Sequence, residues 1–154
     1  MLHLIPRPLH RLLYRIAHFG RRKWLGWRGG TVHGASMIAR DAQGRVLLVR
    51  HAYGSDQWCF PGGRIVRGED PAVAAVREFR EELGCGVRDL VFLGQIREPF
   101  HGAENRVELF TALVEGEPQP DGRELTHAAF FALDRLPPDL AITVPSRIGL
   151  LKQG

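Results

Sequence analysis

The sequence predicts an α/β domain in which a mixed β-sheet carries helices on both faces. Three observations lead to this prediction. Several runs rich in Val, Leu, Ile and Phe surround one long amphipathic segment, a second helical pattern ends the chain, and Gly and Pro separate the segments. At 154 residues, with 44% hydrophobic and 25% charged residues, the chain has the size and composition of one ordinary globular domain.

The N-terminal segment differs in character from the rest of the chain. From Pro8 to about Lys23 apolar residues recur at the spacing of one helix face, at Leu9, Leu12, Leu13 and Ile16. The stretch from Met1 to Arg28 holds seven Arg or Lys and no Asp or Glu. We therefore divide the chain into a basic amphipathic N-terminal helix or extension, residues 1–28, and a domain over residues 29–154.

Charge by itself would suggest a nucleic-acid partner, since the net charge is +4 and the pI is near 9.7. Because seven of the 21 basic residues lie in the extension, however, residues 29–154 carry 14 basic and 17 acidic side chains. The body is mildly acidic, so a nucleic-acid partner is not expected for it. The apolar face of the extension is expected to pack against the body or a second copy, as in a homodimer, with docking on a membrane surface as an alternative.

Location is predicted from charge and cysteine content. No run approaches the roughly 18 apolar residues of a transmembrane segment, and Arg7, Arg11 and Arg15 interrupt any secretory signal. The two cysteines, Cys59 and Cys85, are too few for a disulfide framework. A cytoplasmic location is therefore expected, although an Arg-rich segment without acids also resembles an organelle transit peptide.

The body begins with a predicted β-hairpin. Residues 31–40 and 45–50 are β-favouring, and the turn sequence Asp41-Ala42-Gln43-Gly44 separates them. After a loop, Trp58-Cys59-Phe60 leads into Pro61-Gly62-Gly63, which is a strong break.

The long helix is predicted over residues 71–84. Asp70 is a suitable N-cap, Pro71 suits the first helical position, and Gly84 favours a stop. Beyond it, strands are expected over 90–96, 107–114 and 128–133, and a short helix over 144–152.

Three carboxylates lie together on this helix. At 100° per residue the apolar stripe consists of Ala72, Val76, Phe79 and Leu83. Glu78, Glu81 and Glu82 gather on the opposite side, which we expect to be exposed. Such a cluster is ordinarily a solvated surface, but these like charges repel one another and Arg77 and Arg80 offset them only in part. A hard divalent cation such as Mg²⁺ would relieve the repulsion.

A longer spacing pattern contains this cluster. The order G-x5-E-x7-R-E-U-x-E-E-x-G-U, where U is apolar, is the Nudix box, and all seven fixed letters are present, as Gly63, Glu69, Arg77, Glu78, Glu81, Glu82 and Gly84. Taking about 7% usage per fixed residue, a chance match has a probability on the order of one in a million. Residues 31–138 therefore resemble the Nudix hydrolase family.

This resemblance implies a fold and an activity. The fold would be the Nudix α/β/α sandwich with a mixed sheet. The reaction would be hydrolysis of a nucleoside diphosphate linked to another moiety, as in nucleotide sugars, ADP-ribose or nucleoside triphosphates, with release of a nucleoside monophosphate. The cofactor would be Mg²⁺, with Mn²⁺ as a substitute, and the partner a small nucleotide derivative.

The resemblance also implies roles for individual residues. Glu78, Glu81 and Glu82 would be metal ligands and catalytic residues, together with the backbone carbonyl of Gly62. Glu69 would pair with Arg77 and so fix the loop to the helix, a supporting role that Gly63 and Gly84 would share.

The general base and the substrate contacts are left more open. Family members draw the base from the box or from a later loop, so Glu78 and Glu124 are the candidates, with Glu98 and Glu104 as weaker ones. Base stacking is expected from Tyr53, Trp58 or Phe100 and phosphate contact from Arg50 or Arg64, with ordinary packing as the alternative for each. Two other functions stay open, namely a hydrolase of RNA 5′ ends and a Nudix-like sensor that binds nucleotide without cleaving it.

Overall fold

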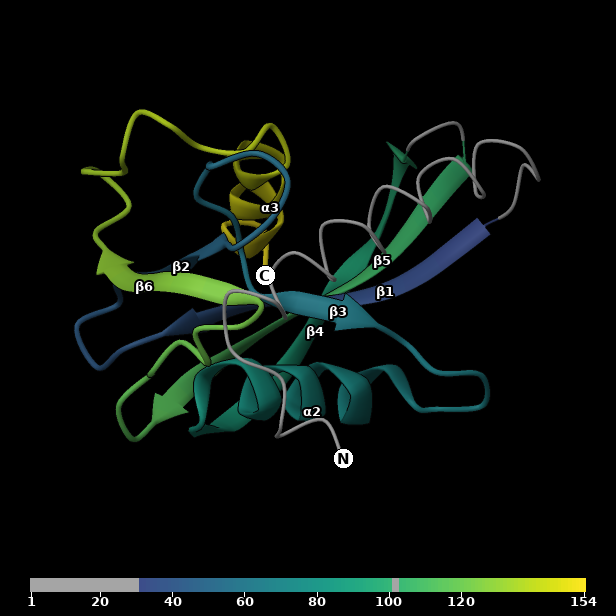
Figure 1. Ribbon diagram of the computed structural model, residues 1–154, viewed down its shortest axis with the longest axis horizontal. Coiled ribbons are helices and arrows are strands. Elements are labelled where there is room, and N and C mark those ends of the chain that lie inside the picture. Colours follow the sequence, from purple (N-terminus) through teal and green to yellow (C-terminus); the bar gives the residue numbers. More distant parts are fainter. Residues whose placement is uncertain (1–30, 101–102) are drawn as a thin grey trace.

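The structure is a computed structural model, and it describes residues 31–100 and 103–154 (Figure 1). The predicted N-terminal helix and the predicted boundary at residue 28 lie outside the described residues. Within the described part, no helix is long and apolar enough to cross a membrane.

A six-stranded mixed sheet forms the centre of the fold. Its strands are β1 (Thr31–Arg40), β2 (Val46–His51), β3 (Gly62–Arg64), β4 (Gly86–Phe100), β5 (Ala103–Glu115) and β6 (Leu125–Phe131). The order is β4-β5-β1-β2-β6, and β3 pairs separately with β1. Pairing is parallel between β1 and β5 and antiparallel between the other neighbours.

Two strands share one edge of β1. The predicted hairpin is confirmed, and β2 pairs with β1 where Arg40 lies opposite Val46. Further along the same edge β3 takes over, with Ser36 opposite Gly62 and Gly34 opposite Arg64. The short glycine-rich β3 is therefore held in the sheet where β2 leaves it to pair with β6.

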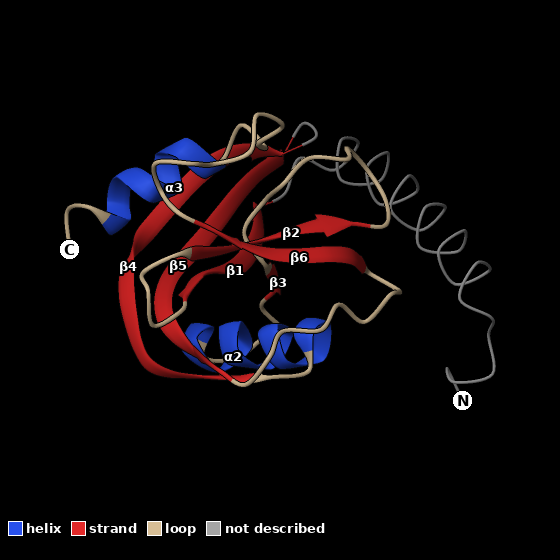
Figure 2. Cartoon of the chain, turned by 90° about the vertical axis from the view of Figure 1, so that its left-hand side faces the viewer, coloured by secondary structure: helices blue, strands red, loops and turns tan. Residues whose placement is uncertain are grey.

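Helices α2 (Pro71–Leu83) and α3 (Val144–Leu151) cover opposite faces of the sheet (Figure 2). The α2 side has its own core, which includes Met37, Phe79, Leu83, Phe110 and Leu125. The α3 side has a second core, which includes Ile38, Phe60, Leu109, Val144 and Ile148. The α/β/α sandwich predicted from the sequence is confirmed.

Helix α2 begins and ends as its local sequence predicts. The Asp70 side chain accepts hydrogen bonds from the backbone N–H groups of Ala72 and Val73, at 2.8 and 3.3 Å. The last helical residue is Leu83, one earlier than predicted, because Gly84 adopts a left-handed conformation with φ of 66° and donates its N–H to the Arg80 carbonyl.

The strand boundaries differ from the prediction. Strands β4 and β5 are longer than the predicted 90–96 and 107–114, because their antiparallel pairing continues through polar residues and two irregularities in register. Strand β6 lies earlier than the predicted 128–133, since its buried Leu125 and its pairing with β2 define it. Residues 58–60 contribute only isolated bridges, between Val49 and Cys59 and between Trp58 and Leu140.

Candidate functional site

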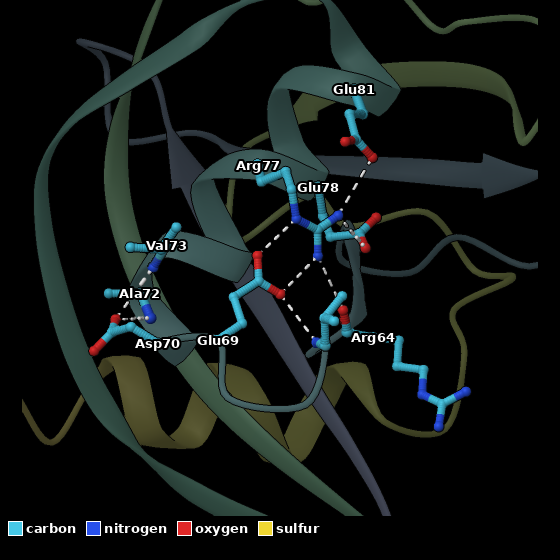
Figure 3. A network of polar contacts seen from close by, with 9 residues as sticks. Arg64, Glu69, Asp70, Ala72, Val73, Arg77, Glu78 and Glu81 are labelled. Carbon is cyan, nitrogen blue, oxygen red and sulfur yellow. Dashed lines mark hydrogen bonds and ion pairs between the residues drawn. The ribbon is translucent and has the colours of Figure 1, made fainter.

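An ion pair connects the loop before α2 to the helix itself (Figure 3). Arg77 donates from Nε to Glu69 Oε1 at 2.7 Å and from Nη2 to Glu69 Oε2 at 3.0 Å, so the predicted pairing is present. Nη2 also reaches the Arg64 carbonyl at 3.1 Å, and Glu69 accepts the Val66 N–H at 2.9 Å. These hydrogen bonds hold the Glu69 pKa down at about 2, and Glu69 in turn raises the pKa of Arg77.

The same guanidinium contacts two further carboxylates of the box. Arg77 Nη1 lies 2.9 Å from Glu78 Oε1 and 3.4 Å from Glu81 Oε2. Glu81 is exposed, whereas the Glu78 side chain retains only 15% of its exposure. Burial therefore raises the pKa of Glu78, although Arg77 opposes the shift. One arginine thus gathers three of the motif's carboxylates along one side of the helix.

Glu82 contradicts the prediction that all three clustered carboxylates are exposed. Only 3% of Glu82 is exposed, because the sheet and the loop between β5 and β6 cover this side of the helix. Burial, followed by repulsion from Glu124, Glu78 and Asp121, raises its pKa well above the ordinary value, and a backbone hydrogen bond with Gly62 opposes the rise. Its Oε2 atom is buried without a hydrogen-bond partner among the described residues.

The glycine pair of β3 is required by close packing. A Cβ atom on Gly63 would lie 2.2–2.6 Å from the carboxylate atoms of Glu78. A Cβ atom on Gly62 would lie 2.3 Å from the Ala35 carbonyl oxygen on β1. The glycines therefore let α2 bring Glu78 and Glu82 directly against the backbone of β3.

Glu124 lies close to this group, as one of the two sequence-based candidates for the base. Its charge raises the pKa of both Glu78 and Glu82, which places the three carboxylates within electrostatic reach of one another. The loop that carries it contacts the end of α2, since the N–H groups of Gln119 and Asp121 donate to the carbonyls of Leu83 and Glu82 at 2.8 and 3.0 Å.

Asp121 was not among the residues predicted from the sequence. Its Oδ1 accepts the backbone N–H groups of Arg123, Glu124 and Leu125, each at 2.9 Å. The available signal was the dipeptide Asp121-Gly122, because Asp-Gly marks a turn and an Asp side chain commonly binds backbone N–H groups just after it.

The weaker candidate bases have other partners. Glu98 forms an ion pair with the buried Arg147 of α3, at 3.2 Å, and Arg147 also donates to Ser36 Oγ at 3.0 Å. Glu104 lies 3.8 Å from Arg97. Neither carboxylate is brought to the box residues by these contacts.

The predicted substrate residues are distributed over several places. The Arg50 guanidinium lies over the Trp58 ring, 4.6 Å from its centroid, and pairs with Asp139, so one face of Trp58 is already covered. Tyr53 lies beside His51, with 5.4 Å between ring centroids. The Arg64 side chain is exposed and points away from Arg77 in Figure 3. Phe100 ends β4, and its side chain lies outside what the structure describes.

The donor set suits a hard divalent cation. Carboxylate oxygens and a backbone carbonyl are the ligands that Mg²⁺ and Mn²⁺ prefer, and the unpartnered Glu82 Oε2 is a buried oxygen that a cation would satisfy. In the described residues as they stand, no three His, Cys, Asp or Glu side chains converge on one point. Two of the predicted ligands, Glu78 and Glu81, instead accept hydrogen bonds from Arg77.

The chain is similar in sequence to several known proteins. An RNA pyrophosphohydrolase of Halorhodospira halophila is 44% identical over 61 residues, which cover 40% of this chain and 33% of that protein. A Bacillus subtilis protein provisionally named an ADP-ribose pyrophosphatase is 30% identical over 142 residues, covering 83% of this chain and 64% of that protein. The matches thus span about a third of the first relative's length and just under two thirds of the second's.

Solved structures and a family model extend the comparison. The crystal structure of the MutT NUDIX hydrolase from Burkholderia pseudomallei matches with a TM-score of 0.71 and 25% identity, over 80% of this chain and 98% of that one. The model of the NUDIX domain matches residues 30–149, which include α2, most of α3, the whole described sheet and the carboxylate cluster. The chain belongs to the NUDIX family.

Proposed function

We propose that this protein is a divalent-metal-dependent pyrophosphohydrolase that cleaves a nucleoside diphosphate linked to another moiety and releases a nucleoside monophosphate. The observation that carries the proposal is Glu82, a carboxylate with 3% exposure, raised pKa and an unpartnered oxygen, beside Glu78 and Gly62. A buried, unpaired carboxylate reduces stability, so its presence in a cluster of like charges favours a role in binding cations.

The metal ligands in this proposal are Glu78, Glu81, Glu82 and the carbonyl oxygen of Gly62. When bound, Mg²⁺ or Mn²⁺ would neutralise the phosphate oxygens and lower the pKa of an attacking water. Glu69 and Arg77 hold the loop to the helix, and Gly63 leaves room for the Glu78 carboxylate. Gly84 ends the helix directly after these ligands.

For the general base we propose Glu124 before Glu78. The Glu124 carboxylate has no hydrogen bond or ion pair with any described residue, whereas Glu78 already accepts a hydrogen bond from Arg77. Glu124 also lies on a different element from the proposed ligands. It can therefore accept a proton from a water molecule beside the cluster without having to dissociate from a bound cation.

The substrate is proposed to be a small nucleotide derivative, and RNA 5′ ends are the second candidate. The relatives named RNA pyrophosphohydrolases include two at 44% and 43% identity, over 61 and 58 residues. The basic residues 1–28 would then hold RNA by its phosphates, and this binding would weaken steeply as salt rises. The mildly acidic body and the relative named for ADP-ribose favour the small-molecule reading.

A metal-dependent substrate panel tests the proposal. Nucleotide sugars, nucleoside triphosphates, ADP-ribose, CDP-alcohols, dinucleoside polyphosphates and a 5′-triphosphorylated RNA are each incubated with the full chain and Mg²⁺, with and without a chelator. We expect nucleoside monophosphate from at least one small nucleotide, lost on chelation. Preferential cleavage of the RNA, weakened by salt and by removal of residues 1–25, would select the second candidate.

Binding of nucleotide without any turnover across the panel would instead select the sensor hypothesis and overturn the proposed activity.

A cytoplasmic location is proposed as well, supported by the free thiols of Cys59 and Cys85.

A further inference from the structure

The loop between β5 and β6, residues 116–124, joins the end of the metal-ligand helix to the proposed base. At its near end, Gln119 and Asp121 donate their backbone N–H groups to the carbonyls of Leu83 and Glu82. These carbonyls belong to the last turn of α2, where the helix itself provides no N–H group to donate to them. The β5–β6 loop therefore supplies the hydrogen-bond donors for the C-terminus of α2. In the chain, β4 and β5 lie between the helix and this loop.

The Asp121 carboxylate organises the rest of this loop. A single oxygen, Oδ1, accepts three consecutive backbone N–H groups, from Arg123, Glu124 and Leu125, each at 2.9 Å. Gly122 has a φ of 70°, which allows the chain to fold back around the side chain. Three donors on one acceptor fix the backbone conformation of the segment that contains Glu124.

The far side of the segment is also held. The Glu124 carbonyl accepts the Ala52 N–H at 2.8 Å, and Leu125 is fully buried in the core on the α2 side. Asp121 is thus bonded to Glu82 through its own N–H and to Glu124 through its side chain. Asp121 therefore links the backbone of Glu82 to the backbone of Glu124 by direct hydrogen bonds.

We infer that Asp121 is a positioning residue of this site, whose carboxylate shapes the β5–β6 loop so that Glu124 stands beside Glu82. The inference rests on the proposed function, because it assigns a purpose to the placement of Glu124. It requires the hydrogen-bond acceptor at position 121 and not its negative charge. A residue that acted by charge or as a metal ligand would instead need the carboxylate itself.

The two requirements are separated by D121A and D121N. Asparagine retains an acceptor oxygen, so D121N is expected to keep kcat within about threefold of wild type, while D121A lowers kcat by about ten- to a hundredfold, the scale of a misplaced catalytic group. KM and the Mn²⁺ affinity, measured by calorimetry, should change less than about twofold in D121A. D134A, which removes an exposed carboxylate, is the matched control and should resemble wild type.

A double-mutant cycle with E124Q measures whether Asp121 and Glu124 act together. A residue that only stabilised the fold would show no such coupling to Glu124. If Asp121 acts through Glu124, D121A/E124Q should be no slower than E124Q alone. Additive losses, a D121N variant as impaired as D121A, or a large loss of Mn²⁺ affinity would each overturn the inference. Should D121A not fold, D121L, which also lacks an acceptor oxygen, takes its place in the cycle with the same expectations.

Hydrogen exchange tests the loop without reference to activity. The amides of Arg123, Glu124 and Leu125 should exchange faster in D121A than in wild type, and D121N should restore their protection. Unchanged exchange in D121A would overturn the inference. If no substrate is hydrolysed, or if Glu124 and Glu82 variants keep full activity, the proposed function fails, and the exchange result still decides whether Asp121 fixes the loop.

Discussion

The two ends of the Nudix box place carboxylates in opposite environments. Glu69 is met by the guanidinium of Arg77 and by a backbone N–H, and its pKa falls to about 2. Glu82 is buried near three other carboxylates, and its pKa rises. The first arrangement stabilises the fold at neutral pH, and the second destabilises it. One motif therefore contains a pair that holds the loop in place and a buried carboxylate for which we propose a cation as the partner.

The largest expected effect follows substitution of the buried group. In Glu82→Gln the hydrolysis rate should fall by about 10²–10³-fold, because a ligand for the cation that stabilises the transition state is lost. The metal-free protein should nevertheless gain about 1–3 kcal/mol of unfolding free energy, since the substitution removes a buried carboxylate that has no ion-pair partner among the described residues and that other carboxylates repel. Steady-state kinetics and urea denaturation measure the two quantities. Glu117→Gln, at an exposed site, is the control, and near wild-type turnover in Glu82→Gln would refute the metal assignment.

Breaking the ion pair between Glu69 and Arg77 should lower the stability of the fold. Arg77→Gln removes the hydrogen bonds to Glu69, Glu78 and Glu81, so we expect a loss of roughly 1–3 kcal/mol in unfolding free energy. Activity should fall about 10–100-fold, as for groups that orient metal ligands. Arg80→Gln, on an exposed position of the same helix, provides the comparison. Equal stability of the two variants would contradict the assigned role of the pair.

A methyl group at Gly63 tests the close packing of Glu78 against β3. Gly63→Ala places a Cβ 2.2 Å from the Glu78 carboxylate, so the helix or the side chain must shift. We expect about 1–3 kcal/mol of destabilisation and roughly tenfold weaker Mn²⁺ binding by calorimetry. Gly149→Ala is the control, because a Cβ there meets no atom within 4 Å. Unaltered Mn²⁺ affinity in Gly63→Ala would show that Glu78 need not sit against β3.

The smallest expected effect is a pH dependence of stability. The raised pKa values of Glu78 and Glu82 favour the fold below their unfolded pKa near 4.5, and this contribution is lost as pH rises through the folded values. Glu69 contributes above 4.5 and loses its contribution only toward pH 2. Between pH 5 and 8 the metal-free Tm should therefore fall with rising pH, by about 2–4 °C more in wild type than in Glu82→Gln. Saturating Mg²⁺ should remove this difference, and identical slopes without metal would argue against an ionisable Glu82.

Local features of the fold were predictable from residues close together in the chain. The caps at Asp70 and Gly84 and the hairpin around residues 41–44 each depend on a few neighbouring residues, and each is present. The pairing of Glu69 with Arg77 spans eight positions, and it too is present. Burial of Glu82 was not predictable, because the helical period distinguishes only an apolar face from a polar one. The part of the polar face that carries Glu82 is covered by distant segments, whereas Glu81 on the same face is exposed.

The sequence by itself determined the family and which carboxylates share α2, since both follow from spacing along a single helix and its preceding loop. Only the tertiary structure decided what surrounds each carboxylate. Three contacts join segments that lie far apart in the chain. They are the parallel pairing of β1 with β5, the pairing of β3 with β1, and the β5–β6 loop on the end of α2. Charge and hydrogen bonding in a buried site depend on these distant neighbours. They are the reason why the environment and the pKa of Glu82 differ from those of Glu69.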